Sequence, residues 1–472
     1  MRGNVFWAGL EAGVSAVLSF ASAFIVARLI GPAEVGIGAA AVAMHVLLWV
    51  GVNALFADAL VQAAAIDETA ASSAFWASSG VGVAGAAIQT AAGWLLAAAF
   101  SDPRLIGMSL LLAAPLPLVG AGGAVQGILT RNRAYKVLAG RAVIGQGLGT
   151  MAGIAAALAG AGAWALVLQQ CVTSLVGALS LILRATWKPR LVMRWAAVRM
   201  LLRTGLPLAA STLVQQSRYR VFAMLIGGTA GPAALGVVHL AFRLVDTLRD
   251  LALTALWRLM LPSMSERQDD LGSLQANVDR GAFLAGLVMF PVIGAMLVTV
   301  RPLLHVVLGQ VWEPAGPAAA PLLLLMAWVF LGFAGSVATI ARGGARYSMV
   351  SQIAVTSATI VGVLVLRPAT PLAAASVWFA AQVLVNPYMM LKTARLMHAG
   401  VFRQYRAGLP VLGLASIATA AALFLPFAPA SAIGLITVRL ATIALVYGAG
   451  VALLLRGALV SALAGASVPK AA

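Results

Sequence analysis

Besides Arg258 near a predicted helix end, six charged side chains lie within two long apolar stretches of this chain, residues 205–227 and 233–261. They are Arg218, Arg220, Arg243, Asp246, Arg249 and Asp250. A charge at the centre of a membrane costs at least about 2.5 kcal/mol, so such residues usually face a polar cavity and pair with one another. Arginine suits an anion with several oxygens, because its planar guanidinium group binds phosphate oxygens in pairs. A buried anion site is therefore one interpretation of these stretches.

The charges of the second stretch can interact along one helix. Arg243, Asp246 and Asp250 fall on one stripe, and Arg249 can also reach Asp246. Two interpretations remain open. The charges form either a neutralised network that holds helices together, or a cavity wall whose ion pairs exchange when an anionic substrate arrives. In the second case the arginines bind the substrate and the aspartates are exchangeable counter-ions.

The two arginines of the first stretch lie deep in the predicted span. Arg218 is roughly 20 Å along a helix axis from Gly205, which is past the midplane of a bilayer. Arg218 and Arg220 cannot lie close together on one helix face, because they are two positions apart. We expect at least one of them to face a polar cleft, although Arg218 could also extend outward to the membrane surface.

The first half of the chain contributes its own deep polar groups. Glu11 lies roughly 9 Å into the first span, and it either carries a coupling proton or cation or pairs with a basic neighbour. His45, near the middle of the second span, is either a packed residue with satisfied hydrogen bonds or a titrating one. Asn53 follows in the same span. Arg141 lies near a predicted helix end, where we expect it to extend to the membrane surface.

The elements that carry these residues are membrane helices. The chain has 472 residues, of which 62% are hydrophobic and 9% charged, whereas soluble domains carry about 25% charge. A spanning helix needs roughly 20 apolar residues, and a transmembrane barrel would show short alternating segments instead. We therefore predict an all-α integral membrane protein with about 14 transmembrane helices. The spans lie near 5–27, 36–57, 74–100, 105–128, 137–160, 162–184, 205–227, 233–261, 281–300, 317–340, 347–366, 371–391, 409–427 and 432–455.

The loop charges predict the orientation. With the N-terminus inside, most of the 31 Lys and Arg residues fall on the cytoplasmic side, and four of them fall in the opposite loops. Those four are Arg28, Arg104, Arg301 and Arg367. This bias predicts an even number of spans with both termini cytoplasmic. The most basic connector, 184–203, reads near its end as an amphipathic helix on the inner surface.

A repeated motif predicts a duplicated architecture. Gly31-Pro32-Ala33-Glu34-Val35-Gly36 returns as Gly231-Pro232-Ala233-Ala234-Leu235-Gly236, each time between two apolar spans. We expect two six-helix lobes in parallel orientation around a central cleft, followed by two additional C-terminal helices. The predicted domains are residues 1–203 with the basic linker, 204–400, and 401–472.

Several classes of function are disfavoured by the residues. The net charge of +18 is spread over loops between spans, which is unlike a nucleic-acid surface and typical of basic cytoplasmic loops. The single cysteine, Cys171, excludes an intramolecular disulfide and a cysteine-based metal site. The four histidines have no paired spacing. We therefore expect no catalytic residues, no metal and no cofactor.

Short segments along residues 1 to about 410 resemble a known family. They occur in order, at the spacing of the family: Ala27–Gly36, Ala59–Gln62, Ser73–Trp76, Asp102–Leu105, Trp164–Val167, Gly231–Gly236, Leu261–Ser265 and Gly309–Ala315. The chain resembles the polysaccharide transporter family of bacterial oligosaccharide flippases, within the multidrug/oligosaccharidyl-lipid/polysaccharide (MOP) exporter superfamily. Members often carry an Asp about nine residues before the second Gly-Pro pair. Phe222 occupies that position here, which puts a cation-coupling role of that site in doubt.

The resemblance implies transport by alternating access through a central cavity lined with cationic residues. The implied substrate is undecaprenyl-diphosphate-linked oligosaccharide, a repeat unit of exopolysaccharide, O-antigen or capsule, moved across the bacterial inner membrane. On this reading the diphosphate is bound by Arg218, Arg220, Arg243 and Arg249. The counter-ion or coupling residues are Asp246, Asp250, Glu11 and His45. Besides membrane lipids, the implied partners are a polysaccharide polymerase and a chain-length regulator, with no nucleic acid.

Other functions remain open at this stage. A lipid II flippase of the same superfamily shares the diphosphate chemistry, whereas a drug/cation antiporter fits poorly with a cationic cavity. A membrane polysaccharide polymerase or glycosyltransferase would need sizeable outer loops with catalytic groups. The longest predicted outer loop, about 301–316, contains only Arg301, His305 and Glu313 as such groups.

Overall fold

The computed structural model consists of helices throughout the part of the chain that it describes, residues 2–185, 187–425, 429 and 431–464. Side chains are described for these residues except 2–12, 15, 16 and 464. The helices are α1 (Arg2–Gln62), α2 (Glu68–Phe100), α3 (Arg104–Ala113), α4 (Leu116–Arg131), α5 (Tyr135–Leu158), α6 (Trp164–Leu183), α7 (Trp195–Ala230), α8 (Pro232–Ser265), α9 (Leu271–Leu308), η1 (Gln310–Trp312), α10 (Ala315–Ala341), α11 (Ala345–Leu366), α12 (Pro371–Leu396), η2 (Arg403–Tyr405), α13 (Leu409–Leu423), α14 (Ala432–Leu454) and α15 (Arg456–Ala464).

These helices confirm the predicted all-α membrane fold. Ten helical stretches among the described residues are long and apolar enough to cross a membrane. The first of them contains a backbone break at Gly31, so α1 holds two of the predicted spans. Helices α7 and α8 are long enough to span but carry the intramembrane charges, and α13 is a shorter apolar helix. Helices α3 and α4 together form one predicted span.

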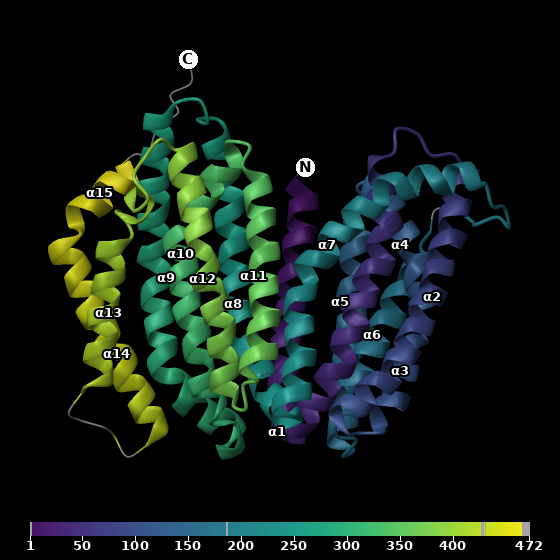
Figure 1. Cartoon of the computed structure of the whole chain (residues 1–472), viewed down its shortest axis with the longest axis horizontal. Coiled ribbons are helices and arrows are strands. Elements are labelled where there is room, and N and C mark those ends of the chain that lie inside the picture. The colour runs from purple at the N-terminus through teal and green to yellow at the C-terminus, as the bar shows by residue number, and fades with distance from the viewer. Residues whose placement is uncertain (1, 186, 426–428, 430, 465–472) are drawn as a thin grey trace. The chain divides into compact units, whose positions relative to one another are not determined.

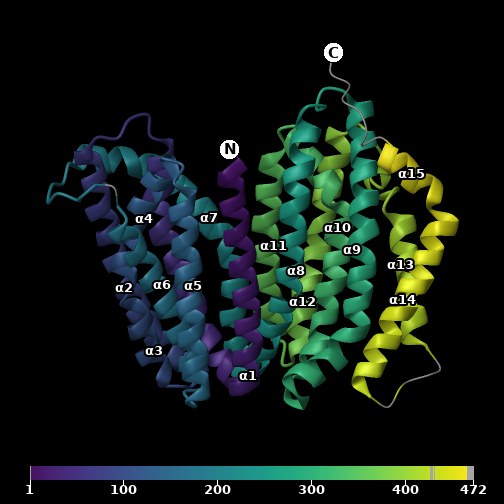
Figure 2. The same ribbon diagram turned by 180° about the vertical axis from the view of Figure 1, so that it is seen from behind.

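The chain divides into two compact units, Met1–His239 and Leu240–Ala472, and Figures 1 and 2 show each as a bundle of long helices. This boundary lies after α7, whereas the sequence predicts a domain boundary at residue 203. The difference has a physical reason, because α7 packs closely along α1. Gly205 lies so near Leu55 that a Cβ atom there would overlap the Leu55 carbonyl oxygen. The predicted domains follow from the repeated motif and remain a prediction, whereas the compact units follow from packing.

The repeated Gly-Pro motif has the same backbone geometry in both copies. Gly31 has φ 77° and ψ 169°, and Gly231 has φ 86° and ψ 167°. Positive φ at this ψ is accessible almost only to glycine, and each glycine is followed by a proline that starts the next helix. The two copies also contact each other within the first unit. A Cβ atom on Gly36 would overlap the carbonyl oxygen of Pro232, and one on Gly236 would overlap that of Pro32.

An ion network fixes the first copy to neighbouring helices. The carboxylate of Glu34 accepts hydrogen bonds from the Ala163 backbone N–H at 2.6 Å and from both terminal nitrogens of Arg104 at 3.0 and 3.1 Å. Arg104 also contacts Asp102 at 2.8 Å and holds the pKa of that carboxyl below its usual range through their hydrogen bonds. Because Ala163 precedes α6, Glu34 caps that helix and ties it to α1 and α3.

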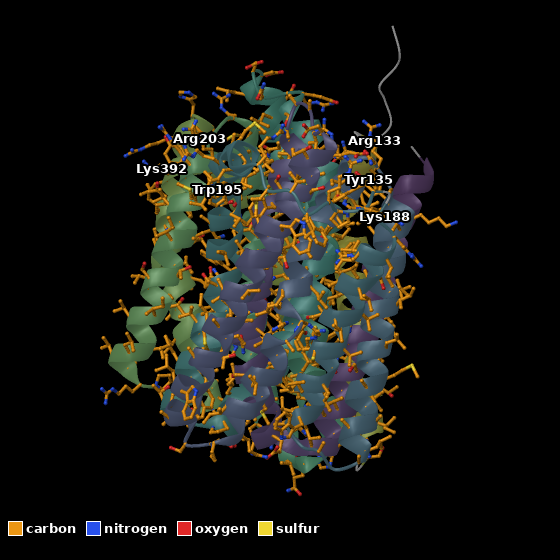
Figure 3. The ribbon with its side chains drawn as sticks, turned by 90° about the vertical axis from the view of Figure 1, so that its right-hand side faces the viewer. Arg133, Tyr135, Lys188, Trp195, Arg203 and Lys392 are labelled. Carbon is orange, nitrogen blue, oxygen red and sulfur yellow. The ribbon has the colours of Figure 1, made fainter. Side chains whose placement is uncertain are left out.

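The last part of the basic linker 184–203 forms the first turns of α7, which begins at Trp195. Val198 and Leu201 are buried in a cluster with Phe75, Leu129 and Leu181, while the intervening side chains are exposed. Figure 3 shows Arg133, Lys188, Trp195 and Arg203 near one end of this unit's helices. The start of α7 is therefore amphipathic, as the sequence predicts, and its basic side chains gather with those of other loops at that end.

Candidate functional site

The intramembrane charges of α8 form a compact ion cluster. Nη1 of Arg249 lies 2.7 Å from Asp246, and Nη2 lies 2.9 Å from Asp250. The side chain of Arg249 is 26% exposed, and those of Asp246 and Asp250 are 31% and 65% exposed. One guanidinium group thus binds two carboxylates of its own helix while remaining accessible. Such pairs can exchange partners, because a second anion can approach the guanidinium group without unfolding the helix.

Arg243 lies on the same helix, one to two turns before this cluster. Its side chain is half-buried and engaged with other groups, as is that of Asp246. The three residues of the expected stripe, Arg243, Asp246 and Asp250, lie on α8, where Arg249 joins the two carboxylates. The cluster is compatible with both interpretations of the sequence, a structural network and an exchangeable anion site.

The arginines of α7 belong to the first unit. Arg218 and Arg220 are half-buried, and both are engaged with other groups. Between them in sequence, the Tyr219 hydroxyl lies 2.7 Å from Nδ1 of His239, at hydrogen-bond distance. This contact ties α7 to the first turns of α8. Sequence reasoning missed it, because a tyrosine and a histidine on successive helices leave no spacing signal.

Phe222 occupies the position where members of the resembling family often carry an Asp. Its side chain is fully buried. The neighbouring Ala223 belongs to the core cluster that includes Leu105, Met108 and Leu235. The position is thus part of the apolar core of the first unit. A carboxylate at this site would have to be buried without a polar environment.

A second polar network lies inside the first unit. Nε2 of the buried His45 lies 3.0 Å from the Ser174 hydroxyl, so His45 has a packed, hydrogen-bonded position on α1. Asn53 donates to Oε1 of Gln126 at 3.4 Å, and Arg141 donates to the same oxygen at 2.8 Å. The sequence predicts that Arg141 extends to the membrane surface, but its side chain turns inward to Gln126. Gln126 and Arg141 are functional candidates that sequence reasoning missed.

This network borders a cavity of about 380 Å³ between α1, α4, α5 and α6. Its polar lining is formed by Asn53, Arg141, Gln146, Gln170, Thr173 and Ser174. Trp49 and several small residues, including Gly145 and Gly177, complete the walls. The volume lies within the range of roughly 300–1,000 Å³ typical of small-molecule sites. Asn53, a deep polar group noted in the sequence, lines the cavity, and the predicted site residue His45 contacts its lining residue Ser174.

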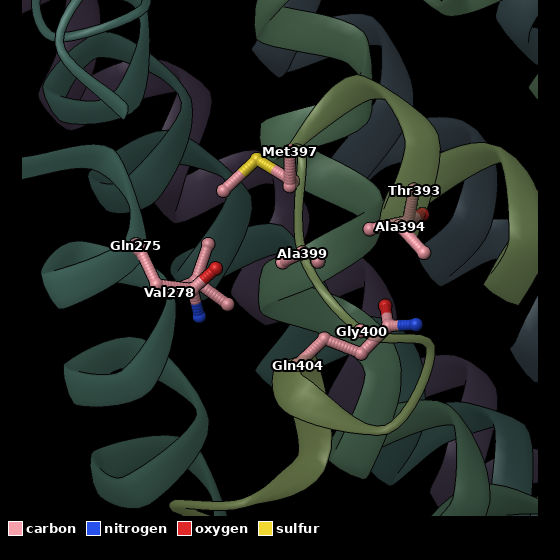
Figure 4. A pocket seen from close by; sticks show the side chains of 9 residues that line it. Gln275, Val278, Thr393, Ala394, Met397, Ala399, Gly400 and Gln404 are labelled. Atoms are coloured by element: carbon pink, nitrogen blue, oxygen red, sulfur yellow. The ribbon is translucent and has the colours of Figure 1, made fainter. Parts of the chain in front are cut away.

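A much smaller pocket of about 10 Å³ lies in the second unit, and Figure 4 shows the side chains of Gln275, Met397 and Gln404 around it. It holds at most about one water molecule, so it is too small for a substrate. No group of three or more His, Cys, Asp or Glu side chains that could hold a metal ion occurs among the described residues. Glu11 lies in α1, and its side chain is outside those described.

The fold resembles those of known transporters. The structure of the lipid II flippase MurJ in an inward closed conformation matches with a TM-score of 0.79 and 11% identity, covering 96% of this chain and all (100%) of that one. An inward-facing multidrug resistance MATE family transporter of the MOP superfamily matches with a TM-score of 0.52 and 14% identity, over 86% of this chain and 95% of that one. The chain therefore shares the fold of these transporters.

Sequence comparison defines the family within that fold. A model of the polysaccharide biosynthesis protein family matches residues 25–317, well over half of the chain, and the chain belongs to that family. The succinoglycan biosynthesis transport protein ExoT of Rhizobium meliloti (strain 1021) is 24% identical over 329 residues. The match covers 68% of this chain but 65% of that relative, which is less than two thirds of its length. The resemblance inferred from the short motifs is confirmed.

Proposed function

We propose that this multi-pass membrane protein moves a polyprenyl-diphosphate-linked oligosaccharide across the bacterial inner membrane by alternating access. The family match and the succinoglycan transport relative support a carbohydrate cargo. The fold shared with a lipid II flippase supports a cargo attached to a lipid diphosphate. On this proposal the chain performs transport without covalent chemistry. Polymerase and chain-length regulator partners belong to the proposal, as does a cytoplasmic position for both termini.

The observation that carries the proposal is the accessible ion cluster on α8. Arg249 is bound by Asp246 and Asp250 at short distances and remains partly exposed in a helix otherwise suited to a membrane. A guanidinium group binds a pair of phosphate oxygens much as it binds a carboxylate, and a diphosphate carries more charge than either aspartate alone, so it can compete with each of them. We propose that Arg243, Arg249 and the α7 arginines Arg218 and Arg220 bind the diphosphate. Asp246 and Asp250 then pair with the arginines again after the diphosphate is released.

Deleting the gene and measuring the polyprenyl-linked glycans by mass spectrometry tests the proposal. A complete oligosaccharide repeat unit should accumulate on the lipid while surface polymer is lost. Accumulation of lipid II would instead identify a cell-wall flippase, the second candidate that the MurJ-like fold favours. If no lipid-linked intermediate accumulates, neither flippase function stands.

Single substitutions then test the ion cluster. Arg243→Ala and Arg249→Ala should abolish polymer export in the deletion strain while the protein remains in the membrane at normal amounts. Arg258→Ala is the matched control, because Arg258 is an exposed arginine on the same helix. Normal export by the Arg243 and Arg249 variants would exclude these residues from diphosphate binding.

A further inference from the structure

The internal cavity of the first unit has the lining of a carbohydrate site. We propose that the space between α1, α4, α5 and α6 binds a sugar ring of the transported glycan, a site separate from the diphosphate-binding arginines. The inference rests on the proposed function for the identity of the cargo. It rests on the cavity for everything else.

The chemistry of the walls favours a polyhydroxylated ligand. The amides of Asn53, Gln146 and Gln170 and the guanidinium group of Arg141 are planar and offer several hydrogen-bonding atoms each. Adjacent hydroxyl groups of a sugar act as both donors and acceptors, so they match such groups. All four of these residues already bind other side chains: Asn53 and Arg141 bind Gln126, Gln146 binds Thr150, and Gln170 binds Ser174. The polar groups are therefore held in place before a ligand enters.

The remaining walls suit the apolar faces of a sugar ring. Trp49 contributes a half-buried indole. The face of an indole packs well against C–H groups, and its N–H can donate a hydrogen bond. Glycines open the space. A Cβ atom on Gly177 would have no atom within 4 Å, although the residue itself is buried in α6. A volume of about 380 Å³ fits part of a repeat unit and excludes the whole of a long oligosaccharide.

Other occupants fit the lining less well. A small cation is disfavoured by Arg141, the charged residue of the cavity lining. A lipid chain is disfavoured because six polar side chains would lose their contacts with water and receive no hydrogen bond in return. A sugar fits better, because its hydroxyl groups can hydrogen-bond to these side chains and it needs no opposite charge.

Gly177 is a suitable position from which to fill the cavity, because it lines the space and a Cβ atom there would meet nothing within 4 Å. Gly177→Leu places a side chain into the open space and should reduce export of surface polymer at least tenfold, with the lipid-linked repeat unit accumulating. Gly147→Leu is the control, because a Cβ atom on Gly147 also meets nothing within 4 Å, but that residue of α5 does not line the cavity. Equal export by the two variants at equal protein amounts would overturn the proposal.

A labelling experiment tests the site without transport. In a Cys171→Ala background, which removes the single native thiol, Gly177→Cys and Gly147→Cys proteins in nanodiscs are treated with N-ethylmaleimide. The probe is a set of oligosaccharides released by partial acid hydrolysis of the host's own surface polymer. These should slow labelling at position 177 severalfold and leave position 147 unchanged.

The outcomes separate this proposal from the proposed function. If labelling at position 177 does not occur, or is not slowed by the oligosaccharides, the cavity is not a sugar site. If the oligosaccharides protect position 177 but gene deletion causes no lipid-linked glycan to accumulate, the sugar site stands and the flippase function fails. Protection by simple fatty acids instead of the oligosaccharides would identify a lipid pocket and overturn the sugar assignment.

Discussion

Replacing Gly36 with alanine should destabilise this protein, contrary to the usual effect of that change in a helix. In a helix interior alanine is favoured over glycine by about 1 kcal/mol. At Gly36, however, the new Cβ atom would overlap the carbonyl oxygen of Pro232 and would approach the Gly236 nitrogen to 3.0 Å. Both neighbours are backbone atoms, so no side-chain rotation relieves the overlap. Overpacking of this kind costs roughly 1–3 kcal/mol.

The net effect of Gly36→Ala is then a loss of up to about 2 kcal/mol, measured as a lower thermal unfolding midpoint of the purified protein in detergent. Gly236→Ala should cost a similar amount, because its Cβ atom would overlap the Pro32 carbonyl oxygen. The double variant should lose less than the sum, since the first substitution already separates the two segments. Gly228→Ala is the control, as that exposed glycine has open space around its Cβ position. A Gly36→Ala protein as stable as the Gly228→Ala protein would refute the close contact.

Substitutions at three further positions have definite expected outcomes. Arg104 lowers the pKa of Asp102 in the folded protein, so their pairing stabilises the fold above about pH 4. This stabilisation is lost as the pH falls through the lowered pKa. Asp102→Asn should therefore flatten the acid side of a plot of unfolding midpoint against pH. Phe222→Asp should sharply reduce the amount of folded protein in membranes, without creating a sodium-dependent activity, since the residue is fully buried in an apolar core. Glu34→Ala should lower the free energy of unfolding by about 1 kcal/mol, because α6 loses its cap. Glu34→Gln should retain part of that stability, because the amide oxygen can still accept a hydrogen bond from the Ala163 backbone N–H. Equal losses in the two variants would show that charge alone matters.

The helices could be predicted because each leaves a local signal in the sequence. The apolar runs predict the spans, and the Gly31 and Gly231 motifs predict the breaks between them. The Arg249 pairs with Asp246 and Asp250 are likewise local, since they lie within one turn of α8. All of these depend on residues near one another in the chain.

Contacts between helices could not be predicted in this way. Arg141 looks like a surface-seeking arginine when only its distance from a helix end is considered. It turns inward because Gln126 on α4 offers an acceptor at 2.8 Å, and that acceptor is itself positioned beside Asn53 of α1. No spacing rule connects three residues on three helices. The packing of α7 against α1, which moves the unit boundary to His239, arises from the same kind of long-range contact.

The two copies of the repeated Gly-Pro motif contact each other, which the sequence alone does not show. Gly36 meets Pro232, and Gly236 meets Pro32, so each copy makes the same contact with the other. This reciprocity is the property of the interface between two identical subunits related by a twofold axis. Both copies have the glycines and prolines that form the contact. The second copy has no equivalent of Glu34, because Ala234 occupies that position. The shared residues therefore maintain the contact between copies, and Glu34 has the separate task of joining the first copy to α3 and α6.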